Sequence, residues 1–178
     1  MDRMMSGMQR TGFPPIAADK ARVLILGSMP GETSLARRQY YAHPRNLFWS
    51  FMQGFCGGDA SRPYEKRLQC LKAHGIALWD VLQHCERDGS LDAGIQSATA
   101  VPNDFEGFLC AHPNIRTIFF NGQTAGLCFR KLVWPNLPDR LRKGLTLTIL
   151  PSTSPANARL PAKAKRAAWR KGIQAALG

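Results

Sequence analysis

Short apolar runs alternate with amphipathic stretches along this chain of 178 residues. Runs of apolar side chains bounded by turn-forming residues are typical of buried strands, and they occur at 21–26, 76–80, 115–120 and 145–150. Apolar residues at helical spacing predict helices over 46–52, 63–74, 103–111, 124–132 and 162–177. Strands that alternate with helices favour an α/β fold, a three-layer α/β/α sandwich around a central, mainly parallel, four-stranded sheet.

The ends and faces of these helices add detail. Pro63 lies near the start of its helix and Gly75 just past its end, while Asn103 or Asp104 can cap the next one. The last helix carries Trp169, Ile173 and Leu177 on one face. Much of its remaining surface is basic, with Lys163, Lys165, Arg166, Arg170 and Lys171. This basic face is expected to border a bound partner, if that partner is a polyanion.

The pattern indicates one folded domain. We expect residues 1–20 to form a flexible leader and residues 21–178 a single domain, because no repeat or low-complexity linker divides them. The first residues lack the continuous apolar segment of a signal peptide. No apolar run approaches the roughly 20 residues that a membrane helix needs. We therefore expect no membrane association and a cytoplasmic location, at the nucleoid in a bacterium.

The charge of the chain points to a polyanionic partner. It contains 24 Lys and Arg against 12 Asp and Glu, which gives a formal net charge of +12. Basic side chains that contact phosphates release counterions from nucleic acid, so a small domain with this charge favours nucleic-acid binding. A generally basic protein without such a partner remains the alternative.

Cysteine and histidine spacing gives no sign of a metal or cofactor. The five cysteines, an odd number, include no Cys-x-x-Cys pair, so neither a disulfide framework, a zinc site nor an iron–sulfur cluster is indicated. The four histidines show no His-x-x-x-His spacing, and no P-loop, Gly-x-Gly-x-x-Gly or Gly-x-Ser-x-Gly motif occurs. We expect reduced cysteines, no bound metal and no cofactor.

Three polar loops leave the ends of predicted strands, at 27–46, 121–123 and 151–159. In an open α/β sheet, ligands bind beyond the carboxyl ends of the strands, so these loops are expected to form one site. Hydroxyl groups at 152–154, between two prolines, can grip a DNA phosphate or simply cap the last helix. An aromatic ring such as Tyr41 can stack on an extruded base while an amide such as Asn46 reads its edge or orients a water. A packed aromatic loop is the alternative, and Tyr40 and Trp49 are expected to belong to the core.

The same segments resemble a known family. Residues 27–31 (Gly-Ser-Met-Pro-Gly) and 41–49 (Tyr-Ala-His-Pro-Arg-Asn-Leu-Phe-Trp) resemble motif 1 of the uracil-DNA glycosylase superfamily, and 151–159 (Pro-Ser-Thr-Ser-Pro-Ala-Asn-Ala-Arg) resembles motif 2. Mismatch-specific members have Gly-x-Asn-Pro-Gly, in which the Asn helps to orient the attacking water, whereas this chain has Met29. That departure, together with the hydroxyl-rich motif 2, is similar to the hypoxanthine-DNA (deoxyinosine) glycosylase family, as are residues 75–81, 89–92 and 119–122.

The resemblance implies a role for each motif residue. Asn46 would supply the essential catalytic amide, and His43 would assist as a donor or acid or else serve packing. Tyr41 would stack on the flipped base, Ser28 and Met29 would line the base site, and Asn121 would read the base edge. The second motif would contact the DNA backbone and fill the duplex through Ser152, Ser154, Pro155, Ala156, Asn157 and Arg159.

The expected activity is hydrolysis of an N-glycosidic bond. No lysine stands at a motif position to form a Schiff base, so we expect a monofunctional glycosylase that removes hypoxanthine and leaves an abasic site in base-excision repair. A uracil-preferring enzyme and a non-catalytic damaged-DNA-binding module are the alternatives. The expected partner is double-stranded DNA with a deaminated base, with single-stranded DNA left open, and the expected state is a monomer.

Overall fold

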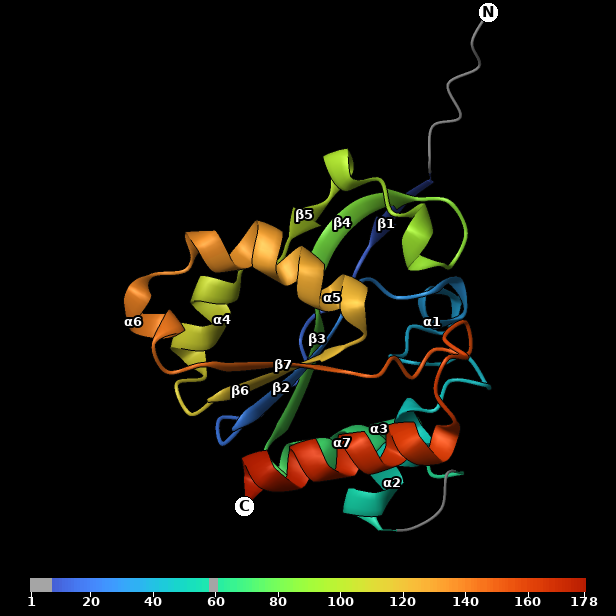
Figure 1. Ribbon diagram of the computed structural model, residues 1–178, viewed down its shortest axis with the longest axis vertical. Coiled ribbons are helices and arrows are strands. Elements are labelled where there is room, and N and C mark those ends of the chain that lie inside the picture. Colours follow the sequence, from blue (N-terminus) through green and yellow to red (C-terminus); the bar gives the residue numbers. More distant parts are fainter. Residues whose placement is uncertain (1–7, 58–60) are drawn as a thin grey trace, which may run out of the picture.

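The computed structural model describes residues 8–57 and 61–178, and its centre is a four-stranded parallel sheet (Figure 1). The strand order is β3-β2-β6-β7. The strands are β2 (Val23–Gly27), β3 (Ile76–Asp80), β6 (Thr117–Asn121) and β7 (Thr146–Leu150). Every residue of β2 and β3 is buried, as expected for parallel strands that are covered on both faces.

Helices cover both faces of this sheet and bury two apolar cores (Figure 1). On one face lie α2 (Phe48–Cys56), α3 (Tyr64–Ala73) and α7 (Ala162–Leu177). The other face is covered by α4 (Phe105–Ala111), α5 (Gln123–Cys128) and its continuation as one π-helical turn, η3 (Phe129–Val133), followed by η4 (Trp134–Asn136) and α6 (Asp139–Arg142). The expected three-layer α/β/α sandwich is thus confirmed.

The predicted elements match the structure closely in the sheet and less closely at helix ends. The strand boundaries differ by one or two residues at most, and α7 has the predicted bounds. Asp104 caps α4, with its carboxylate accepting a hydrogen bond of 2.9 Å from the backbone N–H of Gly107. Helix α2 continues to Cys56, four residues beyond the predicted end.

A second, antiparallel sheet of three strands was not predicted. It has the order β1-β4-β5 and contains β1 (Met8–Thr11), β4 (Leu82–Arg87) and β5 (Val101–Pro102). Short helical turns, η1 (Asp92–Gly94) and η2 (Ser97–Thr99), connect β4 to β5, and α1 (Glu32–Arg37) follows β2. These strands are short and partly exposed, so their sequences lack a continuous apolar run.

The described part of the expected leader belongs to the fold. Strand β1 pairs with β4, and Ile16 forms two backbone hydrogen bonds of 2.8 Å with Leu78 of β3. Residues 8–12 and Ile16 are therefore paired with the rest of the fold, in contrast to the flexible leader expected over 1–20. Residues 1–7 of that leader lie outside the described residues.

One cysteine pair differs from the expectation of reduced thiols. Cys56 and Cys70 form a disulfide with a Cα–Cα distance of 5.8 Å, while Cys85, Cys110 and Cys128 are free. The reason is tertiary: α2 and α3 contact each other, so the last residue of α2 meets the seventh of α3. A spacing of 14 residues carries no such signal in the sequence. None of the described helices is long and apolar enough to cross a membrane.

Candidate active site

The register of the central sheet brings the polar loops to one edge. Gly27 of β2 is paired with Asp80 of β3, and Asn121 of β6 with Leu150 of β7, so these strands end at the same level. The three loops expected to form a site, at 27–46, 121–123 and 151–159, leave this edge, and the chain between the strands and the following helices covers 28–31, 122 and 151–161. The segment 38–47, between α1 and α2, joins them.

Gly27 must be glycine because two side chains occupy the space beside its Cα. A Cβ atom placed there would lie 2.4 Å from the carboxylate of Asp80 and 3.1 Å from the hydroxyl oxygen of Tyr41. The first distance is shorter than any real Cβ contact, so a side chain would displace the carboxylate. The first glycine of the motif therefore lets a carboxylate and a phenol approach the end of β2.

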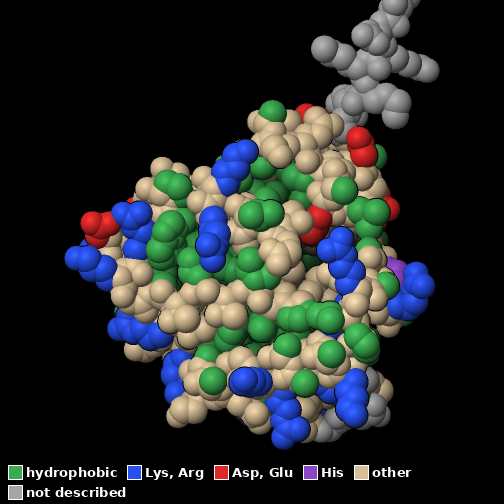
Figure 2. All heavy atoms as spheres, viewed as in Figure 1, with side chains coloured by type: hydrophobic (Ala, Val, Ile, Leu, Met, Phe, Trp, Pro, Cys, Tyr) green, Lys and Arg blue, Asp and Glu red, His purple; other side chains and the backbone are tan. Residues whose placement is uncertain are grey.

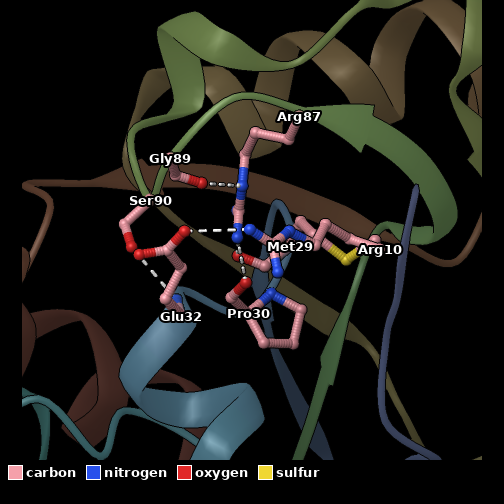
Figure 3. Close-up of polar contacts among 7 residues, drawn as sticks. All are labelled: Arg10, Met29, Pro30, Glu32, Arg87, Gly89 and Ser90. Carbon is pink, nitrogen blue, oxygen red and sulfur yellow. Dashed lines mark hydrogen bonds and ion pairs between the residues drawn. The ribbon is translucent and has the colours of Figure 1, made fainter. Parts of the chain in front are cut away.

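The 28–31 loop is fixed by Arg87 of β4 and Asp92 of η1. The buried guanidinium of Arg87 donates to the carbonyl oxygens of Met29 at 3.3 Å, Pro30 at 2.5 Å and Gly89 at 3.0 Å (Figure 3). The hydroxyl of Ser28 donates to Asp92 at 2.5 Å. These bonds satisfy buried carbonyls that a glycine- and proline-rich turn cannot pair by itself.

Neighbouring side chains extend the same network. Figure 3 shows Arg10 of β1 beside Glu32, whose carboxylate it contacts at 2.8 Å, and Ser90 accepts from the backbone N–H of Glu32 at 3.1 Å. Met29 itself is only 6% exposed and belongs to the apolar core on that side of the sheet. Its side chain is therefore a packing element of the loop as well as a predicted base contact.

Tyr41 lies in a strained conformation with its hydroxyl buried. Its φ angle is 53°, and its ring stacks on Phe48 at a centroid distance of 4.1 Å and an angle of 27°. The hydroxyl oxygen has no hydrogen-bond partner among the described residues. Burial, and next the charge of Asp80, raise the pKa of Tyr41, so the phenol stays protonated.

A tight turn places the two predicted catalytic residues. The backbone N–H of Asn46 donates to the carbonyl of His43 at 2.9 Å, and the N–H of Arg45 donates to His43 Nδ1 at 3.2 Å. The Oδ1 atom of Asn46 accepts a hydrogen bond of 3.0 Å from the N–H of Phe48, the first residue of α2. Both side chains are half-buried, and the amino group of Asn46 has no partner among the described residues.

Thr153 joins the loops into one unit. Its backbone N–H and its hydroxyl bind the Oδ1 and Nδ2 atoms of Asn121, at 2.9 and 2.8 Å, and its carbonyl accepts from the N–H of Leu47 at 3.0 Å. Thr153 is completely buried. The Asn121 side chain, predicted to read the base, thus also fastens β6 to the 151–161 loop, and the Thr153 carbonyl fastens that loop to the segment that carries Asn46.

The 151–161 loop carries small polar residues, and a buried side chain holds it in place. The hydroxyl of Ser152 accepts from the N–H of Ser154 at 3.2 Å, and that of Ser154 accepts from the N–H of Ala156 at 3.3 Å. Lys165, predicted to lie on the exposed basic face of α7, is instead 2% exposed. Its ammonium group donates to the carbonyls of Ser152 at 2.8 Å and Asn157 at 2.5 Å.

The tip of this loop is open to solvent. Pro155, Ala156 and Arg159 are exposed, and Asn157 is half-buried. Below the tip, the indole N–H of Trp169 donates to the carbonyl of Pro151 at 2.8 Å, which ties the start of the loop to α7. An exposed tip on a rigid base can enter a DNA groove without losing its shape.

Asp80 is a buried carboxylate beneath this site. It is 3% exposed, and its Oδ2 atom has no hydrogen-bond partner among the described residues. Burial first, and then the charge of Asp92, raise its pKa to about 7, against a smaller lowering by Arg87. Such a perturbed carboxylate at the carboxyl end of a strand is a feature of functional sites.

The structure brings together most of the predicted site residues. The contacts above connect Gly27, the 41–48 segment, Asn121 and Thr153 at one edge, while the 28–31 loop is bonded to Arg87 and Asp92. Arg159 lies on the exposed part of the 151–161 loop. Sequence reasoning missed Arg87, Thr153 and Lys165 as anchors of the loops. Only Thr153 gave a signal, as the middle hydroxyl of a proline-bounded turn.

One cluster of possible metal ligands exists among the described residues. The ligand atoms of Cys56, Cys70 and His74 lie within 4.8 Å of one another, between α2 and α3. Two of the three are joined as a disulfide, and His74 Nδ1 already lies 2.9 Å from the carbonyl of Cys70. These residues belong to a different part of the fold from the motif loops.

The fold and the two joined motifs define the class of the protein. The model of the uracil DNA glycosylase superfamily matches residues 14–177. This chain belongs to that superfamily.

Two sequence relatives and one solved structure are similar to this chain over most of its length. A protein of Methanosarcina barkeri called hypoxanthine DNA glycosylase is 34% identical over 168 residues, which cover 94% of this chain and 99% of the relative. A protein of the same name from Methanosarcina acetivorans is 36% identical over 164 residues, covering 91% of this chain and 96% of the relative. The solution NMR structure of a candidate uracil DNA glycosylase from Methanosarcina acetivorans, 35% identical, superposes with a TM-score of 0.78 over 96% of this chain and 100% of that chain.

Proposed function

We propose that this chain is a monofunctional DNA glycosylase that hydrolyses the N-glycosidic bond of hypoxanthine in DNA and leaves an abasic site. The observation that carries the proposal is the contact between the two motifs: Thr153 of the second motif accepts a hydrogen bond from Leu47 of the first, and it also binds the amide of Asn121. This places the Asn46 turn beside the serine-rich loop, as a base-flipping enzyme requires for simultaneous contact with an extruded base and the DNA backbone. The names of the two Methanosarcina relatives support hypoxanthine as the base.

The reaction begins with extrusion of the nucleotide. Unpairing costs a few kcal/mol and is least costly for a base that pairs imperfectly, such as hypoxanthine opposite thymine or cytosine. Tyr41, held rigidly on Phe48, offers its ring to the extruded base. The exposed tip formed by Pro155, Ala156 and Asn157 fills the space that the base leaves in the duplex.

Asn46 acts through its amino group. Its Oδ1 atom accepts the capping bond from Phe48, so the Nδ2 atom is the part of the amide that remains for the substrate. A donor at this position hydrogen-bonds an acceptor of the departing purine and stabilises the negative charge that develops on it. The amide does not titrate near neutrality, so Asn46 is not a general base.

His43 donates from the same turn. Its Nδ1 atom accepts from Arg45, which leaves the proton of the neutral imidazole on Nε2. From that nitrogen His43 donates to the leaving base or to a phosphate. The cation-like sugar is stabilised by the negative phosphates of the substrate, and a water completes hydrolysis.

The serine-rich loop and the basic surface bind the DNA backbone. The hydroxyls of Ser152 and Ser154 and the guanidinium of Arg159 contact phosphates flanking the extruded nucleotide. On the face of the molecule drawn in Figure 2, Lys and Arg side chains gather where α7 lies, and few acidic side chains are seen there. A net charge of +12 supports DNA as the partner, and we take double-stranded DNA as the substrate and a monomer as the acting unit. The substrate implies action on chromosomal DNA in the cytoplasm, at the nucleoid in a bacterium.

The test compares bases in one sequence context. Duplexes with a single deoxyinosine or deoxyuridine are incubated with the purified protein under single-turnover conditions and then cleaved at abasic sites with alkali. We expect faster cleavage of the inosine strand. A faster uridine reaction would make uracil the substrate of the same site, consistent with the name of the structural relative. Specific binding of both duplexes without any abasic product would identify a damage-binding module and refute the proposal.

A further inference from the structure

Two carbonyl groups in the middle of the 28–31 loop depend on a side chain. On either side of them, the carbonyls of residues 27, 28 and 31 accept backbone N–H groups, at 2.8, 3.1 and 2.9 Å. Those of Met29 and Pro30 accept from the guanidinium of Arg87, at 3.3 and 2.5 Å. Buried carbonyls that stay unpaired are costly, so Arg87 supplies the donors that the backbone of the described residues does not.

The guanidinium can hold both carbonyls because it is planar and fixed in place. Arg87 is completely buried at the end of β4, where it is paired with Met8 of β1. Its Nη1 and Nη2 atoms bind two successive peptide groups, and its Nε atom donates to the carbonyl of Gly89 at 3.0 Å (Figure 3). A rigid fork bonded at three points fixes the planes of both peptides, which a flexible ammonium group does not do.

Stability alone does not account for an arginine at this position. No carboxylate of the described residues lies within ion-pair distance of its guanidinium. A buried charge without such a partner loses hydration that hydrogen bonds to carbonyls replace only in part. A turn whose carbonyls faced solvent would need no buried charge, so the benefit of Arg87 lies in the shape that it gives this loop.

The segment 87–92 contacts the same loop at two further points. Ser28 donates its hydroxyl to Asp92 at 2.5 Å, and Ser90 accepts the N–H of Glu32 at 3.1 Å. The family resemblance marks most of this segment without giving it a role. These contacts provide one, because the segment runs along the motif loop and holds it at both ends as well as in the middle.

We propose that Arg87 is a positioning residue of this glycosylase: its guanidinium fixes the peptide groups of Met29 and Pro30 and so sets the shape of the loop that borders the base site. The catalytic consequence rests on the proposed function, whereas the effect on the loop does not. Arg87 is buried and acts through the loop, not on the DNA. A displacement of about 1 Å in such a support lowers a rate by up to about a hundredfold.

The first experiment tests the bonds without DNA. Nitrogen-15 NMR follows the exchange of the Nε hydrogen of Arg87 with solvent, and the carbonyl carbon-13 shifts of Met29 and Pro30 are compared between wild type and Arg87→Lys. We expect exchange about a hundredfold slower than for the exposed Arg22, and altered shifts at both carbonyls in the variant. Exchange as fast as that of Arg22, or unchanged carbonyl shifts, would overturn the proposal.

The second experiment measures excision per folded molecule. Single-turnover rates on the inosine duplex are measured against protein concentration for wild type, Arg87→Lys and Arg87→Met, and unfolding curves give the folded fraction of each. Arg22→Met is the matched control, since Arg22 is an exposed arginine at the opposite end of β2, and it should leave the saturating rate unchanged.

The two Arg87 variants should differ in degree. We expect Arg87→Lys to lower the saturating rate about tenfold, the size of one hydrogen bond to a charged group, and Arg87→Met, which donates to neither carbonyl, to lower it about a hundredfold. The half-saturating protein concentration should change by less than about twofold in both, because a buried guanidinium makes no phosphate contact.

The outcomes separate a failure of this proposal from a failure of the proposed function. An unchanged saturating rate per folded molecule in both variants would reduce Arg87 to a structural residue and overturn the positioning role. A weaker half-saturation with an unchanged saturating rate would place Arg87 in DNA binding and overturn it as well. A wild-type protein that excises no base would refute the proposed function and the catalytic role with it, and the NMR experiment would still decide whether Arg87 fixes the loop.

Discussion

Asn46 combines a structural bond with a proposed chemical one, and two substitutions can separate them. Its Oδ1 atom accepts the N–H of Phe48 at the start of α2. Asn46→Asp keeps an oxygen for this bond and removes the amino group, whereas Asn46→Ala removes both. We expect Asn46→Ala to lower the free energy of unfolding by about 1 kcal/mol, with little change in Asn46→Asp.

Both Asn46 variants should lose excision activity by about a hundredfold or more, because each lacks the donor to the leaving base. Single-turnover excision from an inosine duplex and thermal unfolding, measured on the same preparations, check this prediction. Full activity of Asn46→Asp would show that the oxygen, and not the amino group, serves the reaction.

Asp80 should also make the free energy of unfolding depend on pH. Its pKa of about 7 in the folded protein is above its ordinary value of 3.8, so the folded state binds this proton more tightly than the unfolded chain. The proton on Asp80 stabilises the folded state fully below about pH 4, and this contribution is lost as the pH rises to about 7. The free energy of unfolding should therefore fall by on the order of 3 kcal/mol over this window.

Denaturant unfolding at a series of pH values measures this slope. Asp80→Asn cannot titrate and should lack this component, while Asp88→Asn should retain it. A wild-type profile that matches Asp80→Asn between about pH 4 and about pH 7 would show that the pKa of Asp80 is not raised by burial.

At the scale of elements, α7 uses two lysines in different ways. Lys165 is buried and holds two carbonyls of the 151–161 loop, whereas Lys163 is exposed. Lys165→Met leaves those carbonyls unpaired, so it should lower the free energy of unfolding by about 2 kcal/mol and reduce excision without changing the salt dependence of DNA binding. Lys163→Met should leave stability unchanged and reduce the slope of log affinity against log salt by about one.

Binding titrations at several salt concentrations, together with unfolding curves, distinguish the two lysines. A reduced salt slope in Lys165→Met with unchanged stability would place this ammonium group on the DNA instead of the loop. An unchanged slope in Lys163→Met would make the exposed face of α7 solvated surface.

The α2–α3 pair is closed by the disulfide between Cys56 and Cys70. A crosslink across a loop of this length restricts the unfolded chain and is expected to contribute about 3 kcal/mol. Unfolding with and without a reductant measures this contribution, and Cys110→Ser is the control for a free thiol. Because the bond lies away from the motif loops, reduction should leave the excision rate unchanged at temperatures where the reduced protein is folded. An equal unfolding midpoint with and without the reductant would contradict a stabilising crosslink.

The elements that could be predicted are those with a strong local signal. The central strands are continuous apolar runs, and α7 has a clear apolar stripe, so their positions follow from periodicity. The second sheet could not be found in this way, because β1 and β4 are half-exposed and depend on pairing between residues 73 to 79 positions apart. The position of each motif loop at the carboxyl edge followed from the sheet topology alone.

At the scale of the whole molecule, the sequence predicted a candidate site but not the contacts that hold its loops in place. Resemblance marked Asn46, Tyr41 and the serine-rich loop, yet their fixed geometry depends on buried polar contacts from distant parts of the chain. Arg87 lies 57 residues from Pro30, and Thr153 lies 32 residues from Asn121. No local pattern shows that a lysine or an arginine will be buried against carbonyl groups, since both types are usually exposed.

The whole molecule joins a rigid parallel sheet to loops that are fastened to one another, under a strongly positive charge. The charge favours association with any DNA, because phosphate contacts are independent of sequence. Selection of a damaged base therefore depends on extrusion and on the few groups at the sheet edge.

The most direct measurement of the central claim is the mass balance of one turnover. A duplex with one deoxyinosine is incubated with excess protein, the released base is identified by mass spectrometry, and the DNA strand is examined before alkali treatment. The account predicts free hypoxanthine in equal amount to uncut strands that bear an abasic site, and neither product with Asn46→Asp. Absence of free hypoxanthine under conditions where the protein binds the duplex would contradict it.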